Sequence, residues 1–262
     1  MSSPLTDSHA HLADPALLPI VADVVANAVD AGVDRILAVG VDVASSAESV
    51  SLAERFPTVW AAVGVHPHEA MAYDGQALGE LRQLAQHPKV VAIGEIGLDY
   101  YRDLAPRSVQ QSAFVEQLDL AATLGLPVVV HNRDATDDVL RLIGNVERDA
   151  ALAPRAGVLH CFTGDAATAQ QAMRRGFFVS FAGNLTFPRA DALRAVASAV
   201  PGVWLLTETD SPSLAPVPCR GTINQPSNVR LVVEQLAEVR GVSPAAVAAE
   251  TSANARRLFG WA

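Results

Sequence analysis

The sequence predicts an α/β protein: a single-domain (β/α)8 TIM barrel with its active site at the C-terminal ends of the strands. Three observations lead to this fold class. Eight short runs rich in Val, Ile, Leu and Ala recur along the chain, helical patterns separate them, and metal-binding residue types stand where several of the runs end. The 262 residues are half hydrophobic, which suffices for one large core. No linker or change of composition divides the chain, so residues 1–262 are treated as one domain.

Each of the eight apolar runs is predicted to be a strand. Most are continuously apolar rather than alternating, which is typical of parallel strands buried on both faces. No G-x-G-x-x-G follows the first run, so a closed barrel is favoured over a doubly wound nucleotide-binding sheet. The predicted strands are residues 5–11, 35–40, 59–64, 90–95, 127–132, 157–162, 177–182 and 203–210.

Helical patterns fill the intervals, and three of the four described below carry clear start or stop signals. Residues 19–32 end in Gly32, a C-cap residue type. Residues 109–125 end in Gly125, shortly before Pro127. Residues 165–176 begin at Asp165, an N-cap residue type, and stop at Gly176. The fourth pattern, 224–241, follows the last strand.

Composition limits the functional classes. The formal net charge is −9 and no basic run is present, so any phosphate binding must be local, through metal ions or a few arginines. No signal peptide or bilayer-spanning apolar run is recognised, and we expect a cytoplasmic protein with neither a membrane partner nor an obligate protein partner. Cys161 and Cys219 form neither a zinc pair nor a disulfide scaffold.

Six residues of metal-ligand type stand at predicted strand ends. A lone His in an apolar run is usually structural, but a carboxylate there costs several kcal/mol unless it is paired or bound to metal. Mixed His and carboxylate ligation suits Zn, Mn, Co or Fe, and also admits Mg. Two such ions sharing an acid favour metal-assisted hydrolysis. The six are His9, His11, Glu95, His131, His160 and Asp210.

The chain resembles the TatD family of metal-dependent deoxyribonucleases, which are amidohydrolase-like TIM barrels. The matching segments run nearly end to end: "DSHAHL", "GVHPH", "GEIGLDYYRD", "LPVVVHNRDA", "HCFTG", "SFAGNLTF" and "LLTETDSP". The resemblance implies a 3'-5' exonuclease that cleaves phosphodiester bonds of DNA, with RNA left open, using two divalent ions per subunit.

The resemblance also assigns the ligands by position. One ion would be held by His9, His11, Glu95 and Asp210. The second would be held by His131, His160 and Glu95, which bridges the two. Glu95 and Asp210 are therefore the expected catalytic residues, and Asp210 would also orient or deprotonate the attacking water.

Four residues are weaker candidates for contacts with a substrate phosphate. His66 and His68 in "GVHPH" can equally form a structural polar turn, and Arg102 and Arg133 can equally pair with neighbouring acids. Glu208 can orient a ligand histidine, or it can be a buried acid paired with a neighbour. Cys161 is expected to point away from the site if His160 points into it.

The chain departs from the family pattern around the expected substrate path. Members of the TatD family commonly read "CRGKRNEP" after the last strand, whereas this chain reads "CRGTINQP", with Thr222, Ile223 and Gln225 at the altered positions. Pro188 stands where a lysine is common. With fewer cationic residues at these positions, an alternative stays open: a metallohydrolase of another bond, such as an amide or the ester of an aminoacyl-tRNA. A non-catalytic metal-bound scaffold is the third hypothesis.

Overall fold

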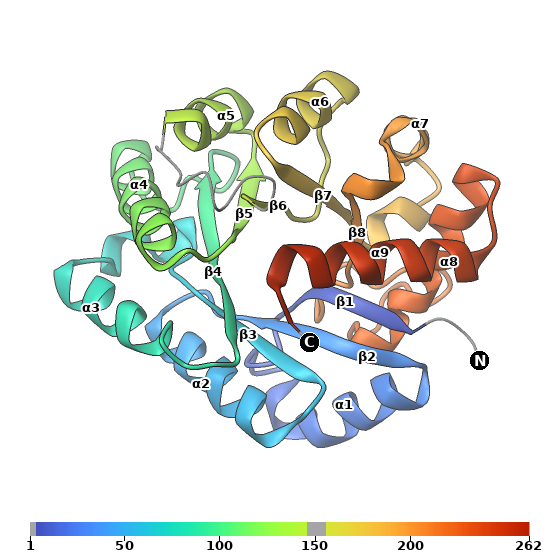
Figure 1. The fold of residues 1–262 in the computed structure, drawn as a ribbon, viewed down its shortest axis with the longest axis horizontal. Coiled ribbons are helices and arrows are strands. Elements are labelled where there is room, and N and C mark those ends of the chain that lie inside the picture. The colour runs from blue at the N-terminus through green and yellow to red at the C-terminus, as the bar shows by residue number, and fades with distance from the viewer. Residues whose placement is uncertain (1–3, 146–155, 262) are drawn as a thin grey trace.

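The computed structural model describes residues 4–145 and 156–261. Eight parallel strands form one sheet in the order β1 to β8. The strands are β1 Leu5–Ala10, β2 Val33–Val39, β3 Val59–Val63, β4 Val90–Asp99, β5 Val128–Arg133, β6 Gly157–Leu159, β7 Phe177–Phe181 and β8 Leu205–Thr207. Figure 1 shows these strands curving round into a barrel, as the sequence predicts.

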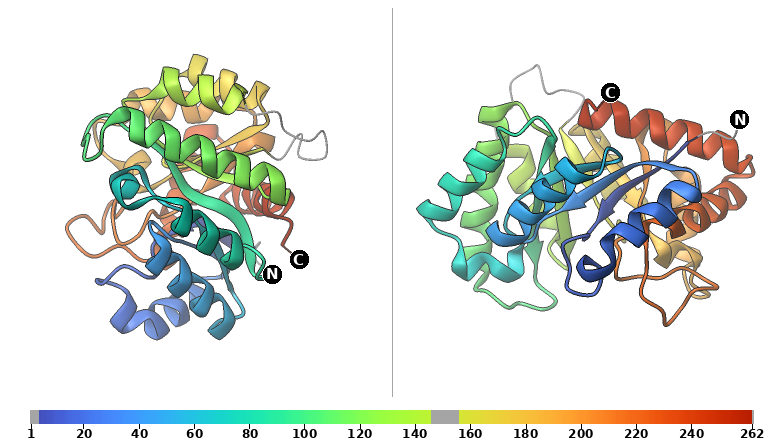
Figure 2. Two further views of the ribbon diagram at one scale, coloured as in Figure 1. Left: turned by 90° about the vertical axis from the view of Figure 1, so that its left-hand side faces the viewer. Right: turned by 90° about the horizontal axis from the view of Figure 1, so that it is seen from below.

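Helices form an outer layer around the strands, as the two views of Figure 2 show. They are α1 Val21–Asp30, α2 Val43–Arg55, α3 Gly75–Leu84, α4 Arg107–Leu124, α5 Thr136–Asn145, α6 Ala166–Arg174, α7 Asp191–Ala199, α8 Val229–Arg240 and α9 Pro244–Phe259. Among the described residues, no helix is long and apolar enough to cross a bilayer.

The predicted helix signals act as expected at most ends. Gly125 and Gly241 adopt left-handed φ values of 68° and 65° directly after α4 and α8. The Asp165 side chain accepts the backbone N–H of Thr168 at the start of α6. The predicted helix 224–241 begins only at Val229, because Pro226–Asn228 form a 3-10 turn first.

The barrel closes between β1 and the segment after β8. Ala10 and Ser211 form a parallel bridge, and the His11 N–H donates to the Ser211 carbonyl at 2.8 Å. Asp7, fully buried on β1, accepts the Thr209 backbone N–H at 2.8 Å and lies 2.5 Å from the Thr209 hydroxyl. The first strand is therefore fixed against the end of the chain's last strand.

The C-terminal ends of three strands differ from the prediction by three or more residues. The expected strand 157–162 ends at Leu159. The expected strand 203–210 is reduced to Leu205–Thr207, since Gly202–Trp204 form a 3-10 turn before it. The expected strand 90–95 continues to Asp99, because residues 96–99 pair with β5 from Val130 to Arg133. Glu95 consequently lies within β4 rather than at its end.

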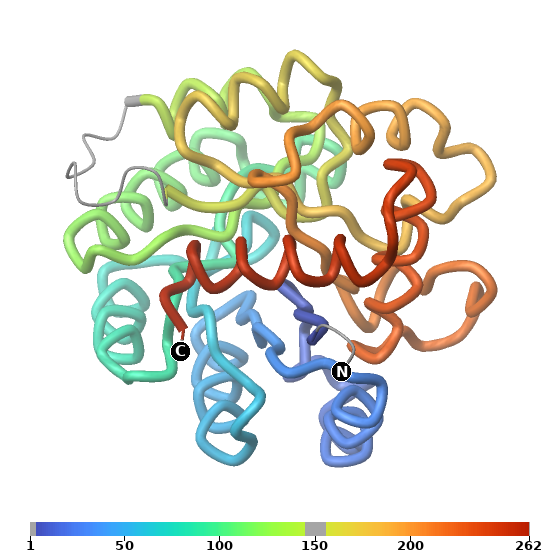
Figure 3. Tube along the Cα trace, turned by 45° about the vertical axis from the view of Figure 1, so that its right-hand side comes forward, coloured from blue at the N-terminus to red at the C-terminus, as the bar shows by residue number. Residues whose placement is uncertain are grey.

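A cap at the N-terminal end of the strands was not predicted from sequence. The helix α9 lies across one end of the barrel, as Figure 3 shows. It and the residues after it bring Leu258, Phe259 and Trp261 onto the apolar side chains of the barrel interior, among them Val91 and Phe178. This closed, apolar end leaves the opposite end for chemistry.

Candidate metal centre

A cavity of about 920 Å³ opens at the C-terminal end of the barrel. Glu95 lies at its base and is 2% exposed. All six metal-ligand residues predicted from sequence lie together here, arranged around the Glu95 carboxylate.

One oxygen of Glu95 faces three imidazoles. Oε1 lies 2.7 Å from Nε2 of His160, 2.8 Å from Nδ1 of His131 and 3.4 Å from Nε2 of His66. These residues come from the ends of β6, β5 and β3. The oxygen therefore belongs to the predicted second ligand group, with His66 as an additional neighbour.

The other oxygen faces the first strand. Oε2 of Glu95 lies 3.4 Å from Nε2 of His9 and 3.5 Å from Nε2 of His11. Oδ1 of Asp210 lies 3.8 Å and 3.5 Å from the same two nitrogens. Glu95 thus presents one oxygen to each predicted group, which is the arrangement a bridging ligand needs.

The glycines of "GEIG" permit β4 to approach β5 closely. Gly97 has a φ of 141°, and a Cβ atom there would lie 2.1 Å from the His131 carbonyl oxygen. A side chain at this position would push the two strands apart. The close approach is what places Glu95 next to His131.

Left-handed backbone at two turns directs side chains into the cavity. Asp210 has a φ of 54° and Cys161 a φ of 44°, a conformation that non-glycine residues rarely adopt. Both residues line the cavity. The prediction that Cys161 points away is wrong, because strand alternation ends at Leu159 and the turn redirects its side chain.

The buried charges compensate one another. Burial alone raises the pKa of Glu95, but the charges of His160 and His66 and bonds from His131 and His160 outweigh it, and the pKa lies well below its usual range. Burial lowers the pKa of His160, but Glu95 and Glu208 raise it well above 6.5 overall. Burial lowers the pKa of His66 to about 4.

Three of the four predicted histidine ligands also have an acceptor for their outer nitrogen. Nδ1 of His11 lies 3.2 Å from the Val39 carbonyl, and Nδ1 of His160 lies 3.3 Å from Oε1 of Glu208. Nε2 of His131 lies 3.2 Å from Oδ2 of Asp99. Such partners fix the ring orientation and the tautomer of metal-binding histidines.

Sequence reasoning missed the place of Asp99. The sequence predicts Asp99 only as a loop residue near the opening that can pair with Arg102, yet its fully buried carboxylate lies 2.8 Å from Nε2 of His68 as well as against His131. The only sequence signal is its spacing, four residues after Glu95, which places both on one side of β4.

The weaker candidates separate into two groups. His66, His68 and Arg133 line the cavity, and the Arg133 guanidinium lies 4.1 Å above the ring of Tyr101. Arg102 is exposed and does not line the cavity; only its backbone N–H is used, as a donor to Asp99. The phosphate contact expected from Arg102 stays a prediction, since its side chain is not among the residues that line the cavity.

The donor set fits two divalent ions. The inward atoms are imidazole nitrogens and carboxylate oxygens, the ligands that Zn, Mn, Co and Fe share. The carboxylates of Glu95, Asp210, Asp99 and Glu208 lie in or directly behind the two groups, where divalent ions would compensate their charge. Without cations this many buried acids would be costly.

Comparison with known proteins gives consistent matches. The family model described as "TatD related DNase" matches residues 6–260. The chain is 38% identical over 255 residues to the "Uncharacterized metal-dependent hydrolase YabD" of Bacillus subtilis, covering 97% of this chain and 98% of that protein. It is 39% identical over 244 residues to the "3'-5' ssDNA/RNA exonuclease TatD" of Cronobacter sakazakii, covering 90% of each.

A solved structure agrees with these matches. The crystal structure of YJJV, a TatD homologue from Escherichia coli, superimposes with a TM-score of 0.91 at 30% identity, covering 98% of both chains. The similarity in sequence and in fold therefore extends over almost the whole chain.

Proposed function

The chain belongs to the TatD-related DNase family of metal-dependent hydrolases, and from this premise we propose that it hydrolyses phosphodiester bonds, removing nucleotides from the 3' end of single-stranded DNA. A relative 39% identical to it is named a 3'-5' ssDNA/RNA exonuclease. The observation that carries the proposal is the Glu95 carboxylate, which faces two separate groups of ligand-type side chains at the base of an open cavity.

His9, His11, Asp210 and one oxygen of Glu95 would hold one ion. His131, His160 and the other oxygen of Glu95 would hold the second. Bound divalent ions supply a Lewis acid for the phosphoryl group and make a water acidic enough to attack near neutral pH.

Asp210 is assigned as the proton acceptor. Its left-handed backbone projects the carboxylate into the cavity, where its side chain remains 16% exposed. Oδ1 faces the His9 and His11 imidazoles, so the carboxylate is oriented by the residues it works beside. A carboxylate in this place can take the proton of the attacking water and return it to the leaving oxygen.

His66 is assigned as a hydrogen-bond donor to a phosphoryl oxygen. Its Nδ1 accepts the backbone N–H of His68 at 3.1 Å, so in the neutral ring the proton lies on Nε2. Nε2 faces Glu95 and the cavity. A protonated nitrogen is a donor and not a metal ligand, which separates His66 from the two ligand groups although it lies beside one of them.

Arg133 and Tyr101 suit the next part of a single strand. The guanidinium lies over the ring and lines the cavity, while Tyr101 is 62% exposed at its edge. A cation and an exposed aromatic face together bind a phosphate and stack a base.

A second candidate function has its own support. The acids Asp14, Asp42, Glu48 and Glu69 line the cavity, while Arg133 is the one arginine or lysine among the described lining residues. Thr222, Ile223 and Pro188 are exposed and uncharged. This lining suits a substrate with a cationic group, such as an aminoacyl ester or amide, better than a long polyanion.

A labelled oligonucleotide tests the proposal. With Mn²⁺ or Mg²⁺ added, a 3'-labelled single strand should release labelled mononucleotide at once, while a 5'-labelled strand should shorten stepwise. A strand blocked at its 3' end by a phosphorothioate should resist. Internal fragments without mononucleotide would contradict the 3'-5' direction.

Substitution of the proton acceptor links the activity to this site. Asp210→Asn should lower kcat by about a hundredfold or more. Asp14→Asn, which changes an acid of the same cavity, should leave kcat within about twofold. If DNA stays intact while an aminoacyl ester is cleaved, with the same loss in Asp210→Asn, the second function replaces the first.

A further inference from the structure

Behind the two ligand groups lies a buried carboxylate with one oxygen unused. Glu208 is fully buried directly after β8. Its Oε1 accepts the Cys161 backbone N–H at 2.7 Å and lies 3.3 Å from Nδ1 of His160. Its Oε2 is buried and has no hydrogen-bond partner among the described residues. A buried acceptor left in this state is destabilising.

One predicted histidine ligand, His9, has a buried ring nitrogen without an acceptor. Nε2 of His9 faces Glu95 and Asp210, and its buried Nδ1 has no partner within residues 4–145 and 156–261. His11, His131 and His160 each have an acceptor for the outer nitrogen, so among these four ligands His9 is the exception.

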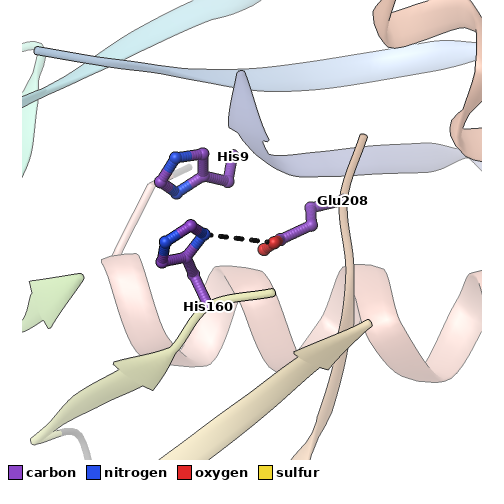
Figure 4. A group of neighbouring side chains, drawn as sticks. All are labelled: His9, His160 and Glu208. Carbon is purple, nitrogen blue, oxygen red and sulfur yellow. Dashed lines mark hydrogen bonds and ion pairs between the residues drawn. The ribbon is translucent and has the colours of Figure 1, made fainter. Parts of the chain in front are cut away.

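The two unpartnered atoms belong to one cluster. The His9 and His160 rings stack with centroids 3.9 Å apart and planes 9° from parallel. One donor atom each from His9, His160 and Glu208 lie within 4.8 Å of one another. Figure 4 shows Glu208 reaching from its strand toward the two stacked rings.

This cluster is not itself a third metal site. When His9 and His160 use their inward Nε2 atoms as ligands, each neutral ring carries its proton on Nδ1. A protonated nitrogen has no lone pair for a metal. The cluster therefore contains two N–H donors and one carboxylate, which is a hydrogen-bonding arrangement.

We propose that Glu208 is a positioning residue shared by both halves of the metal centre: one oxygen orients His160, and the other accepts the Nδ1 proton of His9, directly or through one buried water. Glu208 then fixes a ligand from each group, and so sets the affinity for both ions. Asp99, in contrast, orients His131 alone among the predicted ligands.

The inference rests on the proposed metal centre but not on the bond that is cleaved. It is tested by metal binding, so failure to cleave DNA leaves it standing. The full-length chain is prepared with either His131→Ala, which keeps the His9, His11, Glu95 and Asp210 group, or His11→Ala, which keeps the Glu95, His131 and His160 group. The affinity of each background for Co²⁺ is measured by calorimetry and by the visible absorption of the bound ion.

Glu208→Gln is then added to both backgrounds. In this variant the amide oxygen keeps the place of Oε1, because it accepts the Cys161 N–H. The amide NH₂ then takes the place of Oε2, so the Nδ1 proton of His9 meets a donor instead of an acceptor. Co²⁺ affinity in the His131→Ala background should fall about 10–100-fold, and in the His11→Ala background by a smaller factor. Asp99→Asn should weaken binding only in the His11→Ala background. Glu48→Gln, an acid on α2 that lines the same cavity, is the control and should change neither.

Two results would overturn the inference. One is a Co²⁺ affinity in the His131→Ala background that Glu208→Gln leaves within twofold of its parent. The other is absence of Co²⁺ binding in both parent backgrounds, which removes the centre and the inference together. Circular dichroism of the metal-free variants identifies loss of fold. In that case the imidazole ¹H–¹⁵N spectra of the wild type decide, since the inference requires the His9 Nδ1 proton to be hydrogen-bonded, with a downfield shift and slow exchange with solvent, and not merely to be present.

Discussion

Asp7→Ala should remove the connection that closes the barrel beside the metal centre. The Asp7 carboxyl group, whose pKa burial raises to about 8, accepts the backbone N–H groups of Thr209 at 2.8 Å and His9 at 3.3 Å, and bonds the Thr209 hydroxyl at 2.5 Å. All three residues are 0% exposed, so water cannot supply replacement hydrogen bonds when the Asp7 side chain is removed.

The magnitude follows from the groups left unpaired. Two buried N–H donors without an acceptor cost about 1–3 kcal/mol each, and the lost hydroxyl bond adds about 1 kcal/mol. Asp7→Ala should therefore lower the free energy of unfolding by about 4 kcal/mol, a large part of the usual 5–15 kcal/mol for a folded domain.

Urea unfolding of the metal-free protein measures this loss without any contribution from bound ions. Asp7→Asn keeps the size and the hydrogen-bonding atoms and should cost less than about half as much. Glu69→Ala, which removes an exposed acid, should change the midpoint little. A loss below about 1 kcal/mol in Asp7→Ala, with an unchanged m value, would refute the reasoning.

Three further changes test other parts of the structure. Gly97→Ala places a Cβ 2.1 Å from the His131 carbonyl oxygen at a positive φ. It should lower the free energy of unfolding by at least about 2 kcal/mol and weaken Co²⁺ binding. The control Gly79→Ala, in the open middle of α3, should raise the free energy of unfolding by up to about 1 kcal/mol in the same urea assay. Trp261→Ala uncovers the apolar end of the barrel and should lower the free energy of unfolding by about 3–5 kcal/mol while kcat changes less than twofold; a large fall in kcat would show that the two ends are coupled. Removal of metal with EDTA should lower the melting temperature and abolish hydrolysis, and added Mn²⁺ should restore both. The reason is that ions bound only by the folded state stabilise it. A melting temperature unaffected by EDTA and by Mn²⁺ would contradict a metal centre built around Glu95.

The strands and the six ligand-type residues could be predicted from sequence because both depend on local patterns. Continuous apolar runs indicate buried parallel strands, and the ends of such strands meet at one end of a barrel. The helix α9 was missed because it follows the eighth helix, where the repeated strand–helix pattern no longer predicts a continuation.

Side-chain direction at the strand ends could not be predicted in the same way. Alternation along a strand predicts that Cys161 and His160 face opposite sides, but the left-handed turn at Cys161 brings both to the cavity. Arg102 lies three residues past Asp99, where its backbone N–H donates to the Asp99 carboxylate, and it does not line the cavity.

The sequence by itself determined the barrel and the identity of the residues around its opening, since apolar periodicity, glycine stops and ligand-type residues are properties of short segments. Only the tertiary structure decided which atoms face one another: that Glu95 gives one oxygen to each group, that Asp99 lies behind His131, and that Glu208 lies behind His9 and His160. The physical reason is that these contacts join strands far apart in the chain. Their geometry is fixed by the close approach of β4 to β5 and by the closure of β8 onto β1, which no local pattern specifies.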